Sequence, residues 1–141
     1  MAEVVITRVE EFSAAHRLHN PALSDEDNAR IYGYCNNPSG HGHNYRLEVS
    51  VAGEPDPKTG YLVDLKILRD LIRERIISEV DHKHLNTDVP WLAGIIPSVE
   101  NLAVAFWERL DGRIPGARLY SIKLFETERN FVTYYGPGGP K

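Results

Sequence analysis

The chain has 141 residues and a net charge of −4, with 42% hydrophobic and 26% charged residues. A chain of this length buries about two-thirds of its unfolded surface in one domain, so we expect a single domain over residues 1–141. The acidic balance disfavours nucleic acid and anionic membranes as partners, and the single cysteine excludes an internal disulfide and a cysteine-rich metal knuckle.

No segment of the sequence predicts export or insertion into a membrane. Residues 1–5 lack a basic region followed by an apolar core, so no signal peptide is expected. No apolar run approaches the roughly 20 residues of a membrane span. We therefore expect a cytoplasmic protein without a membrane partner.

Two strands are expected in the first half of the chain. Apolar residues alternate over 4–15, where the polar Arg8 and Glu10 interrupt the pattern and indicate either a bulge or a strand with two occupied faces. The polar stretch 17–34 is expected to be a loop with at most one helical turn. The second strand covers 41–53 and ends at a turn rich in proline and acidic residues.

Two helices are expected next. Apolar residues recur at helical spacing from Asp64, a suitable N-cap, to about Val80. Ser98 is the expected N-cap of the second helix, with Glu100 in its first turn, where the helix dipole favours a carboxylate. This helix should end before the glycines of 112–116.

The remaining chain predicts two further strands, over 118–126 and 130–135, and a flexible tail at 136–141. The order β-β-α-α-β-β with hairpin-length loops favours an α+β fold. We expect one four-stranded antiparallel sheet with two helices on one face. Such a small sheet has exposed edges, so strand edges are the expected surfaces for an oligomer.

Three histidines are the candidates for a metal site. If the second strand begins at His41, the Cα atoms of His41 and His43 lie roughly 6.5–7 Å apart on one face, and Gly42 leaves space between them. His16 ends the first strand, which should lie beside the start of the second. Three neutral imidazoles with an open fourth position are typical of catalytic zinc. The alternative is a strand-edge pair bonded to backbone carbonyls.

Cys35 lies in the polar turn before these histidines. A lone cysteine is most often a small buried apolar residue, but the polar neighbours disfavour that interpretation. A nearby dication would stabilise its thiolate, which could act as a general base or a nucleophile. As a fourth zinc ligand it would instead close the site.

Asp81 and His82 could form a carboxylate–imidazole pair after the first helix. Adjacent residues face each other only where the backbone is not helical, so the alternative is a histidine stabilised by the helix dipole. His19 and His84 are interpreted as structural or exposed.

Glu126 shares the apolar face of the strand that contains Ile122 and Leu124. A buried carboxylate without a partner is costly. Its partner could be a basic side chain or a ligand with a two-donor edge, which a carboxylate binds bidentately.

Five segments carry a resemblance to a known family: FSAAHRL at 12–18, CNNPSGHGHNY at 35–45, DHK at 81–83, EN at 100–101 and ET at 126–127. Over about 12–135 the chain closely resembles the 6-pyruvoyl-tetrahydropterin synthase family. The related 6-carboxy-tetrahydropterin synthases typically have three residues between the cysteine and the His-Gly-His. This chain has five, 36–40, which fits the pyruvoyl type.

The resemblance implies a tunnelling fold, in which sheets join across a trimer into a barrel and two trimers stack into a homohexamer. It implies 7,8-dihydroneopterin triphosphate as the substrate and 6-pyruvoyl-tetrahydropterin as the product, formed by eliminating triphosphate and by internal redox. No nucleotide cofactor is implied, which agrees with the absence of a phosphate-binding glycine motif.

The resemblance also implies residue roles. His16, His41 and His43 would bind Zn²⁺, which holds the side-chain hydroxyls of the substrate. Cys35 would remove a C–H proton. Asp81 and His82 of a neighbouring subunit would assist proton transfer.

The remaining implied roles concern the pterin ring and the phosphates. Glu126 would bind the guanidine-like edge of the ring, with Ser98, Val99 and Glu100 at the same pocket. The family often has a hydroxyl residue where Val99 stands, so a hydrogen bond there must use the backbone. The triphosphate has no assigned partner; by charge alone Arg8, Arg17 and Lys123 are candidates, and each can equally be a solvated basic residue.

Two alternatives stay open. One is a 6-carboxy-tetrahydropterin synthase of the queuosine pathway, acting on the same substrate. The other is a non-catalytic assembly module stabilised by zinc.

Overall fold

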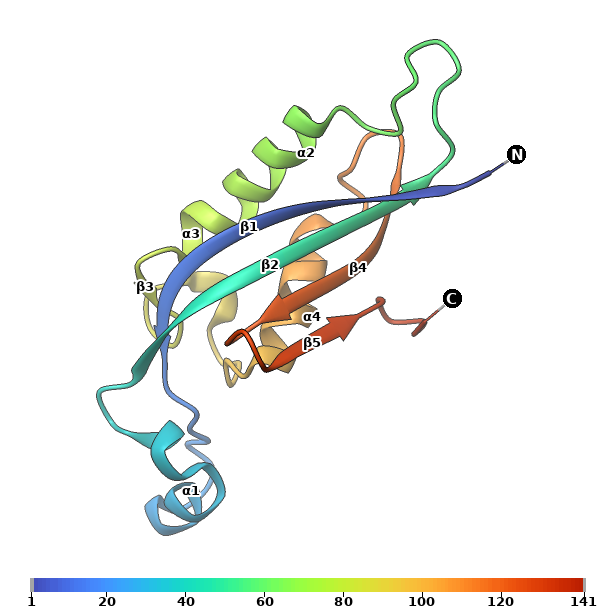
Figure 1. Ribbon diagram of the computed structural model, residues 1–141. Helices are drawn as coiled ribbons and strands as arrows, with labels where there is room; N and C mark the ends of the chain where they lie inside the picture. Colours follow the sequence, from blue (N-terminus) through green and yellow to red (C-terminus); the bar gives the residue numbers. More distant parts are fainter. Residues whose placement is uncertain (1, 141) are drawn as a thin grey trace.

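One twisted sheet organises the computed structural model, which describes residues 2–140. Its strand order is β3-β1-β2-β4-β5, and the helices α2, α3 and α4 lie on one side of it (Figure 1). The strands are β1 (Val4–His16), β2 (His41–Gly53), β3 (Lys83–His84), β4 (Arg118–Phe125) and β5 (Phe131–Tyr134). The four predicted strands are confirmed to within one residue at each end, and the α+β class with them.

The sheet is mixed, which corrects the prediction of four antiparallel strands. β3 pairs in parallel with β1, where Ala14 faces Lys83 and Ala15 faces His84. Two residues leave no periodic pattern to recognise, so the sequence gives no signal for this strand. β3 nevertheless holds the segment 81–84 against the end of β1.

The long β1–β2 ladder has an unbroken register from Val4–Gly53 to His16–His41. The expected bulge at Arg8 and Glu10 is absent, so the second interpretation holds: both faces are occupied. Arg8 and Glu10 form an ion pair, in which Arg8 Nη2 lies 2.9 Å from Glu10 Oε1. Arg73 Nε lies 2.7 Å from the same oxygen. The register shift instead lies between β2 and β4, at Ser50–Val51.

The first predicted helix is one helical segment in three parts: α2 (Leu65–Ile72), a π-helical turn η2 (Arg73–Ile77) and α3 (Ser78–Val80). Asp64 caps it as expected, because its Oδ1 accepts from Lys66 N at 2.8 Å. The second helix, α4 (Val99–Leu110), begins at Ser98, whose Oγ accepts from Asn101 N at 3.2 Å.

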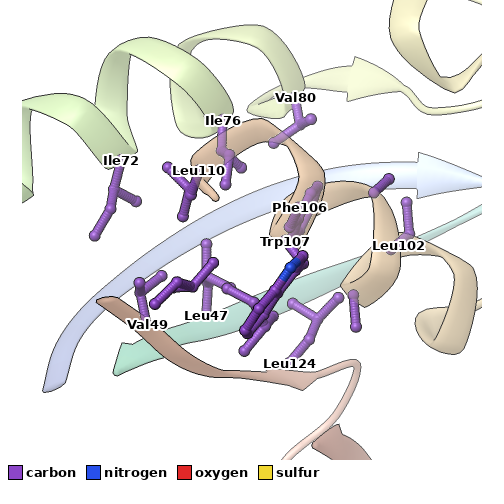
Figure 2. Close-up of a cluster of buried hydrophobic side chains, with 14 of the residues drawn as sticks. Leu47, Val49, Ile72, Ile76, Val80, Leu102, Phe106, Trp107, Leu110 and Leu124 are labelled. Atoms are coloured by element: carbon purple, nitrogen blue, oxygen red, sulfur yellow. The ribbon is translucent and has the colours of Figure 1, made fainter. Parts of the chain in front are cut away.

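The core lies between the sheet and these helices (Figure 2). Leu47 and Val49 of β2 face Ile72 and Ile76 across it, and Phe106 of α4 fills its centre. All five side chains are fully buried. The core therefore holds the helices against the face of β2 on which Leu47 and Val49 lie.

The connection between β1 and β2 forms a lobe away from this core (Figure 1). It contains α1 (Asp25–Tyr32) and the short 3-10 helix η1 (Gly33–Asn36), where a loop was expected. Ser24 caps α1, accepting from Asp27 N at 3.0 Å. A further 3-10 turn, η3 (Pro90–Leu92), precedes α4.

The segment expected to be a flexible tail begins with an ordered turn. Gly136 is buried against Trp107, and Gly139 N donates to Gly136 O at 3.0 Å. Residue 141 lies outside the described residues. Among residues 2–140 there is no helix with the length and apolar character needed to span a bilayer.

Candidate active site

Three histidines meet at the end of the β1–β2 ladder. His16 ends β1 directly opposite His41, and His43 lies two residues further along β2. One ring nitrogen from each lies within 4.8 Å of the others. The closest pair, His16 Nε2 and His41 Nε2, is 3.0 Å apart. The predicted convergence of these three side chains is confirmed.

A backbone carbonyl orients the His16 ring. Pro97 O, in the loop before α4, lies 2.7 Å from His16 Nδ1. A carbonyl oxygen only accepts, so Nδ1 carries the proton and Nε2 keeps its lone pair. Nε2 is also the nitrogen that faces the other two histidines. Metal-binding histidines are commonly held from behind by such a carbonyl.

The unpaired atoms of the cluster fit a cation. His43 Nε2 and His41 Nδ1 are buried without a hydrogen-bond partner in the described part of the chain. The lone pair of His16 Nε2 faces His41 Nε2 at 3.0 Å, which is repulsive unless a cation or a proton lies between them. The cluster could therefore bind a metal ion, and imidazole donors suit a borderline divalent metal.

Burial favours the neutral form of two of these histidines, His16 and His43. Desolvation lowers the pKa of His16 and of His43 below the ordinary value for histidine, and the neighbouring His41 acts in the same direction. A metal ligand must be unprotonated, so this shift favours binding at neutral pH. Burial also raises the pKa of Tyr45, so the phenol beside His16 stays protonated.

Glu126 lies beside the cluster, one residue past β4. Its Oε1 is 3.8 Å from His43 Nε2, and its Oε2 is 3.9 Å from His16 Nε2. Among residues 2–140 no lysine or arginine forms an ion pair with Glu126. The basic groups nearest to this carboxylate in the described residues are therefore the imidazoles of His16 and His43, and the two-donor ligand stays a prediction.

The side chains of Asp81 and His82 face each other, and the backbone at this point is not helical, as such a pair requires. The helix ends at Val80, and His82 has φ 62°, which places its Nδ1 3.0 Å from Asp81 Oδ1. The same oxygen accepts from Ser13 N at 2.9 Å, and this N–H lowers the pKa of the Asp81 carboxyl. The His82 side chain is 83% exposed.

Cys35 is half-buried in η1 and its thiol is free. Its carbonyl accepts from Leu18 N at 2.8 Å, which ties η1 to the segment after β1. The histidine cluster of the described residues does not include Cys35. Its expected role as a base stays a prediction.

A cavity of about 840 Å³ opens beside the cluster. Its lining includes Phe12, His43, Tyr45, Asp81 and Glu126, so two segments far apart in sequence, at 81 and 126, share one space. Phe12 stacks on Tyr45, with ring centroids 4.8 Å apart, and forms an apolar floor. The volume is in the range of small-molecule sites.

Ser98, Val99 and Glu100 do not line this cavity. They form the start of α4, where Ser98 is half-buried and Glu100 is exposed. They follow Pro97 directly, so they adjoin the carbonyl that holds His16. A pterin bound in the cavity of this single chain would not reach these three residues through the cavity lining, so their contact with a pterin stays a prediction.

Sequence reasoning missed Pro97, Phe12 and Tyr45 as parts of the site. The Pro97 carbonyl acts across 81 residues of sequence, and backbone groups leave no trace in residue identity. The Phe12–Tyr45 pair had a signal, because the register that opposes His16 and His41 also opposes these aromatic residues.

Comparisons with known proteins agree with this site. A family model described as 6-pyruvoyl tetrahydropterin synthase matches residues 5–137. The 6-pyruvoyl tetrahydrobiopterin synthase of Poecilia reticulata is 49% identical over 131 residues, covering 93% of this chain and 89% of the relative. The synthase of the same name from Homo sapiens is 45% identical, covering 93% and 90%.

A solved structure is also similar. The structure of Caenorhabditis elegans 6-pyruvoyl tetrahydropterin synthase superposes with a TM-score of 0.91 at 39% sequence identity, covering 96% of this chain and 97% of that one. The match extends over the mixed sheet and its helices. The chain therefore belongs to the 6-pyruvoyl tetrahydropterin synthase family.

Proposed function

We propose that this protein is a zinc-dependent lyase that converts 7,8-dihydroneopterin triphosphate into 6-pyruvoyl-tetrahydropterin with loss of triphosphate. The observation that carries the proposal is the convergence of three imidazoles beside the Glu126 carboxylate, in a chain of this family. The names of the relatives give the product class, and the resemblance of the site residues implies the substrate.

The three histidines would hold the zinc ion. His16 would use Nε2, because Pro97 occupies its Nδ1, and His43 would use its orphaned Nε2. When bound, zinc supplies Lewis-acid polarisation of the substrate hydroxyls and lowers the pKa of their protons. Since no thiol or carboxylate belongs to the cluster in residues 2–140, a fourth position is left for the substrate.

Glu126 would bind the guanidine-like edge of the pterin. Its carboxylate has no cationic partner of its own in the described chain and borders the cavity that Phe12 and Tyr45 floor. A bidentate pair of N–H donors from the ring would satisfy both oxygens. The same contact would direct the side chain of the pterin toward the histidines. His43 Nε2 and His16 Nε2 lie 3.8 and 3.9 Å from the carboxylate oxygens of Glu126.

Cys35 would remove the proton from a side-chain carbon, as a thiolate that the charge of the zinc ion would stabilise. Asp81 is ionised at neutral pH, because the Ser13 N–H holds its pKa low. It therefore orients the His82 ring through Nδ1 and leaves Nε2 to exchange a proton.

Assembly would complete the site. His82 is 83% exposed, and Ser98, Val99 and Glu100 lie outside the single-chain cavity. The outer edge of β1 pairs with β3 only at Ala14 and Ala15, which leaves most of a long strand edge free. We propose that sheets join at such edges into a barrel, as a trimer and then a homohexamer, so that these residues meet a pterin bound to another subunit.

The test is product analysis by mass with zinc-loaded protein and 7,8-dihydroneopterin triphosphate. We expect release of triphosphate and a product that keeps the three-carbon side chain. A one-carbon carboxylate would instead make this a 6-carboxy-tetrahydropterin synthase. Loss of the fold on chelation, with no triphosphate released by the loaded protein, would leave only a zinc-stabilised assembly module.

A further inference from the structure

A second cavity, of about 360 Å³, lies between the segment after β1 and the loop before α4. Its lining includes the basic side chains of Arg17, His19 and His84 and contains no carboxylate. The function proposed above uses none of these three residues. A phosphate-binding site typically has several N–H donors around one space and no acidic side chain, as this cavity does.

Hydrogen bonds hold Arg17 in place before any ligand arrives. Its Nε donates to Asn36 O at 2.9 Å, which leaves both Nη groups for a ligand. Its backbone N–H donates to Asn86 Oδ1 and its carbonyl accepts from Asn86 Nδ2, both at 2.8 Å. Little ordering entropy is then lost when the guanidinium binds an anion.

Both histidines are fixed as N–H donors. Asn36 Nδ2 lies 2.9 Å from His19 Nδ1 and also donates to Leu18 O at 2.8 Å. An amide nitrogen only donates, so His19 Nδ1 accepts and the proton is on Nε2. Asn86 N donates to His84 Nδ1 at 3.3 Å, so His84 also carries its proton on Nε2.

Two residues that line this cavity are the sequence neighbours of residues in the metal site. Arg17 follows the ligand His16 directly, with Cα atoms about 3.8 Å apart. Ile96, in the opposite wall, precedes Pro97, whose carbonyl lies 2.7 Å from His16 Nδ1. The wall of this cavity thus includes the residue after the ligand His16 and the residue before the carbonyl that orients its ring.

His84 provides a third connection to the cluster. Its ring covers Gly40, the residue before His41: a Cβ on Gly40 would lie only 2.8 Å from His84 Nε2 and 3.1 Å from His16 O. Gly40 has φ 77°, so both its conformation and the lack of a side chain suit this contact.

The larger cavity is a poor place for a polyanion. Its lining includes the carboxylates of Glu11, Asp81, Glu126 and Glu128. Its arginine, Arg46, already lies 2.8 Å from the Glu48 carboxylate. A triphosphate there would be repelled by like charges.

Two of the three basic residues proposed from charge alone are also unsuited. Arg8 is paired with Glu10 at 2.9 Å, and Lys123 Nζ lies 4.4 Å from the centroid of Phe131. Neither lines either cavity.

From this we infer that Arg17, His19 and His84 form the subsite for the triphosphate group of the substrate. The inference rests on the proposed function for the identity of the ligand. The substrate would then extend from the acidic cavity, past the metal, to the basic one.

The test is the affinity for inorganic triphosphate, measured by isothermal titration calorimetry on the zinc-loaded assembly. We expect Arg17→Gln to weaken it about 10-fold or more, since a charge-assisted hydrogen-bond partner is lost, and His84→Gln to weaken it severalfold. Affinity for unphosphorylated dihydroneopterin should stay unchanged in both variants. Circular dichroism and zinc content verify that each variant is folded.

Two controls make the assignment specific. Arg30→Gln changes an exposed arginine on α1, and Lys83→Gln changes the exposed lysine of β3, which lines a neighbouring depression with His82 and His84 but does not line the basic cavity. Neither should alter triphosphate affinity. If Lys83→Gln weakens binding and both Arg17→Gln and His84→Gln do not, the subsite is wrong.

The outcomes also separate this inference from the proposed function. An active enzyme whose triphosphate affinity is insensitive to Arg17→Gln and to His84→Gln would overturn the subsite and keep the reaction. Weakened triphosphate binding in those variants, in a protein that does not act on the pterin substrate, would keep the cavity as a polyphosphate site and overturn the reaction.

Discussion

The histidine cluster and the Asp81–His82 pair lie close together in the fold but are held in opposite ways. The His16 side chain is 1% exposed and ends a regular ladder, with a carbonyl behind it. The His82 side chain is 83% exposed and sits on backbone with φ 62°, a conformation rare for a residue with a Cβ. The three histidines that could bind a metal converge within one chain, whereas the exposed Asp81–His82 pair is left open to a substrate or a second subunit.

Because the two regions differ in this way, we expect substitutions in each of them to have different effects. Changes in the cluster should remove binding and catalysis together. Changes in the open half should remove catalysis and spare the metal, and changes at the helix caps should act mainly on stability.

The largest effect is expected for His41→Ala. It removes one of three ligands, so zinc affinity should fall by more than the roughly 10- to 100-fold cost of losing a second-shell partner, and turnover should be lost with it. Metal content after dialysis measures this. His19→Ala, outside the cluster, is the control for zinc content. A fully zinc-loaded His41→Ala protein would remove His41 from the ligand set.

Cys35→Ala should lower the turnover number by about 10²- to 10⁴-fold, the usual contribution of a general base. Zinc content and the fold should be unchanged, because Cys35 is not part of the cluster. Release of triphosphate gives the rate. Normal turnover would disprove the role of Cys35 as base, and loss of zinc would make it a ligand.

Glu126→Gln should weaken binding of a pterin analogue by about 10- to 100-fold, since a charged hydrogen-bond acceptor for two N–H groups becomes a neutral amide. Zinc content should stay the same. Glu54→Gln, in the exposed turn after β2 and outside this cavity, is a control that should bind normally. Equal binding by the wild type and Glu126→Gln would refute the anchor.

The smallest effect is expected for Ser98→Ala. Loss of the cap on α4 should lower the free energy of unfolding by about 1 kcal/mol, and Ser24→Ala should do the same at α1. If Ser98 also contacts a pterin, only Ser98→Ala should raise KM, by about 10-fold or less. Denaturant unfolding and steady-state kinetics separate the two roles. An unchanged KM would place Ser98 outside the pterin pocket.

The strong periodic patterns predicted four of the five strands and the two main helical segments. The alternation over 41–53 predicted β2 to the residue, and the spacing of Leu68, Ile72 and Ile76 predicted the helical segment after Asp64. The π-helical turn within that segment was not expected, because it changes the backbone without changing which face is apolar. α1 was taken for a loop, although Ser24 followed by Asp27 is a capping pattern.

The candidate site was predictable where side-chain type determines it. His16, His41 and His43 converge because a strand register follows from parity and ladder geometry. The contribution of Pro97 was not predictable, since its carbonyl reaches His16 only through the packing of α4. The basic cavity was also not predictable, because Arg17 and His84 are brought together by Asn86 and β3, which leave no periodic signal.

X-ray absorption at the zinc edge of the loaded protein tests the central claim most directly. We expect nitrogen scatterers at about 2.0–2.1 Å from three imidazoles and one light atom in the remaining position, without sulfur. A sulfur scatterer at about 2.3 Å would mean that Cys35 closes the site, and the catalytic account of this metal centre would be wrong.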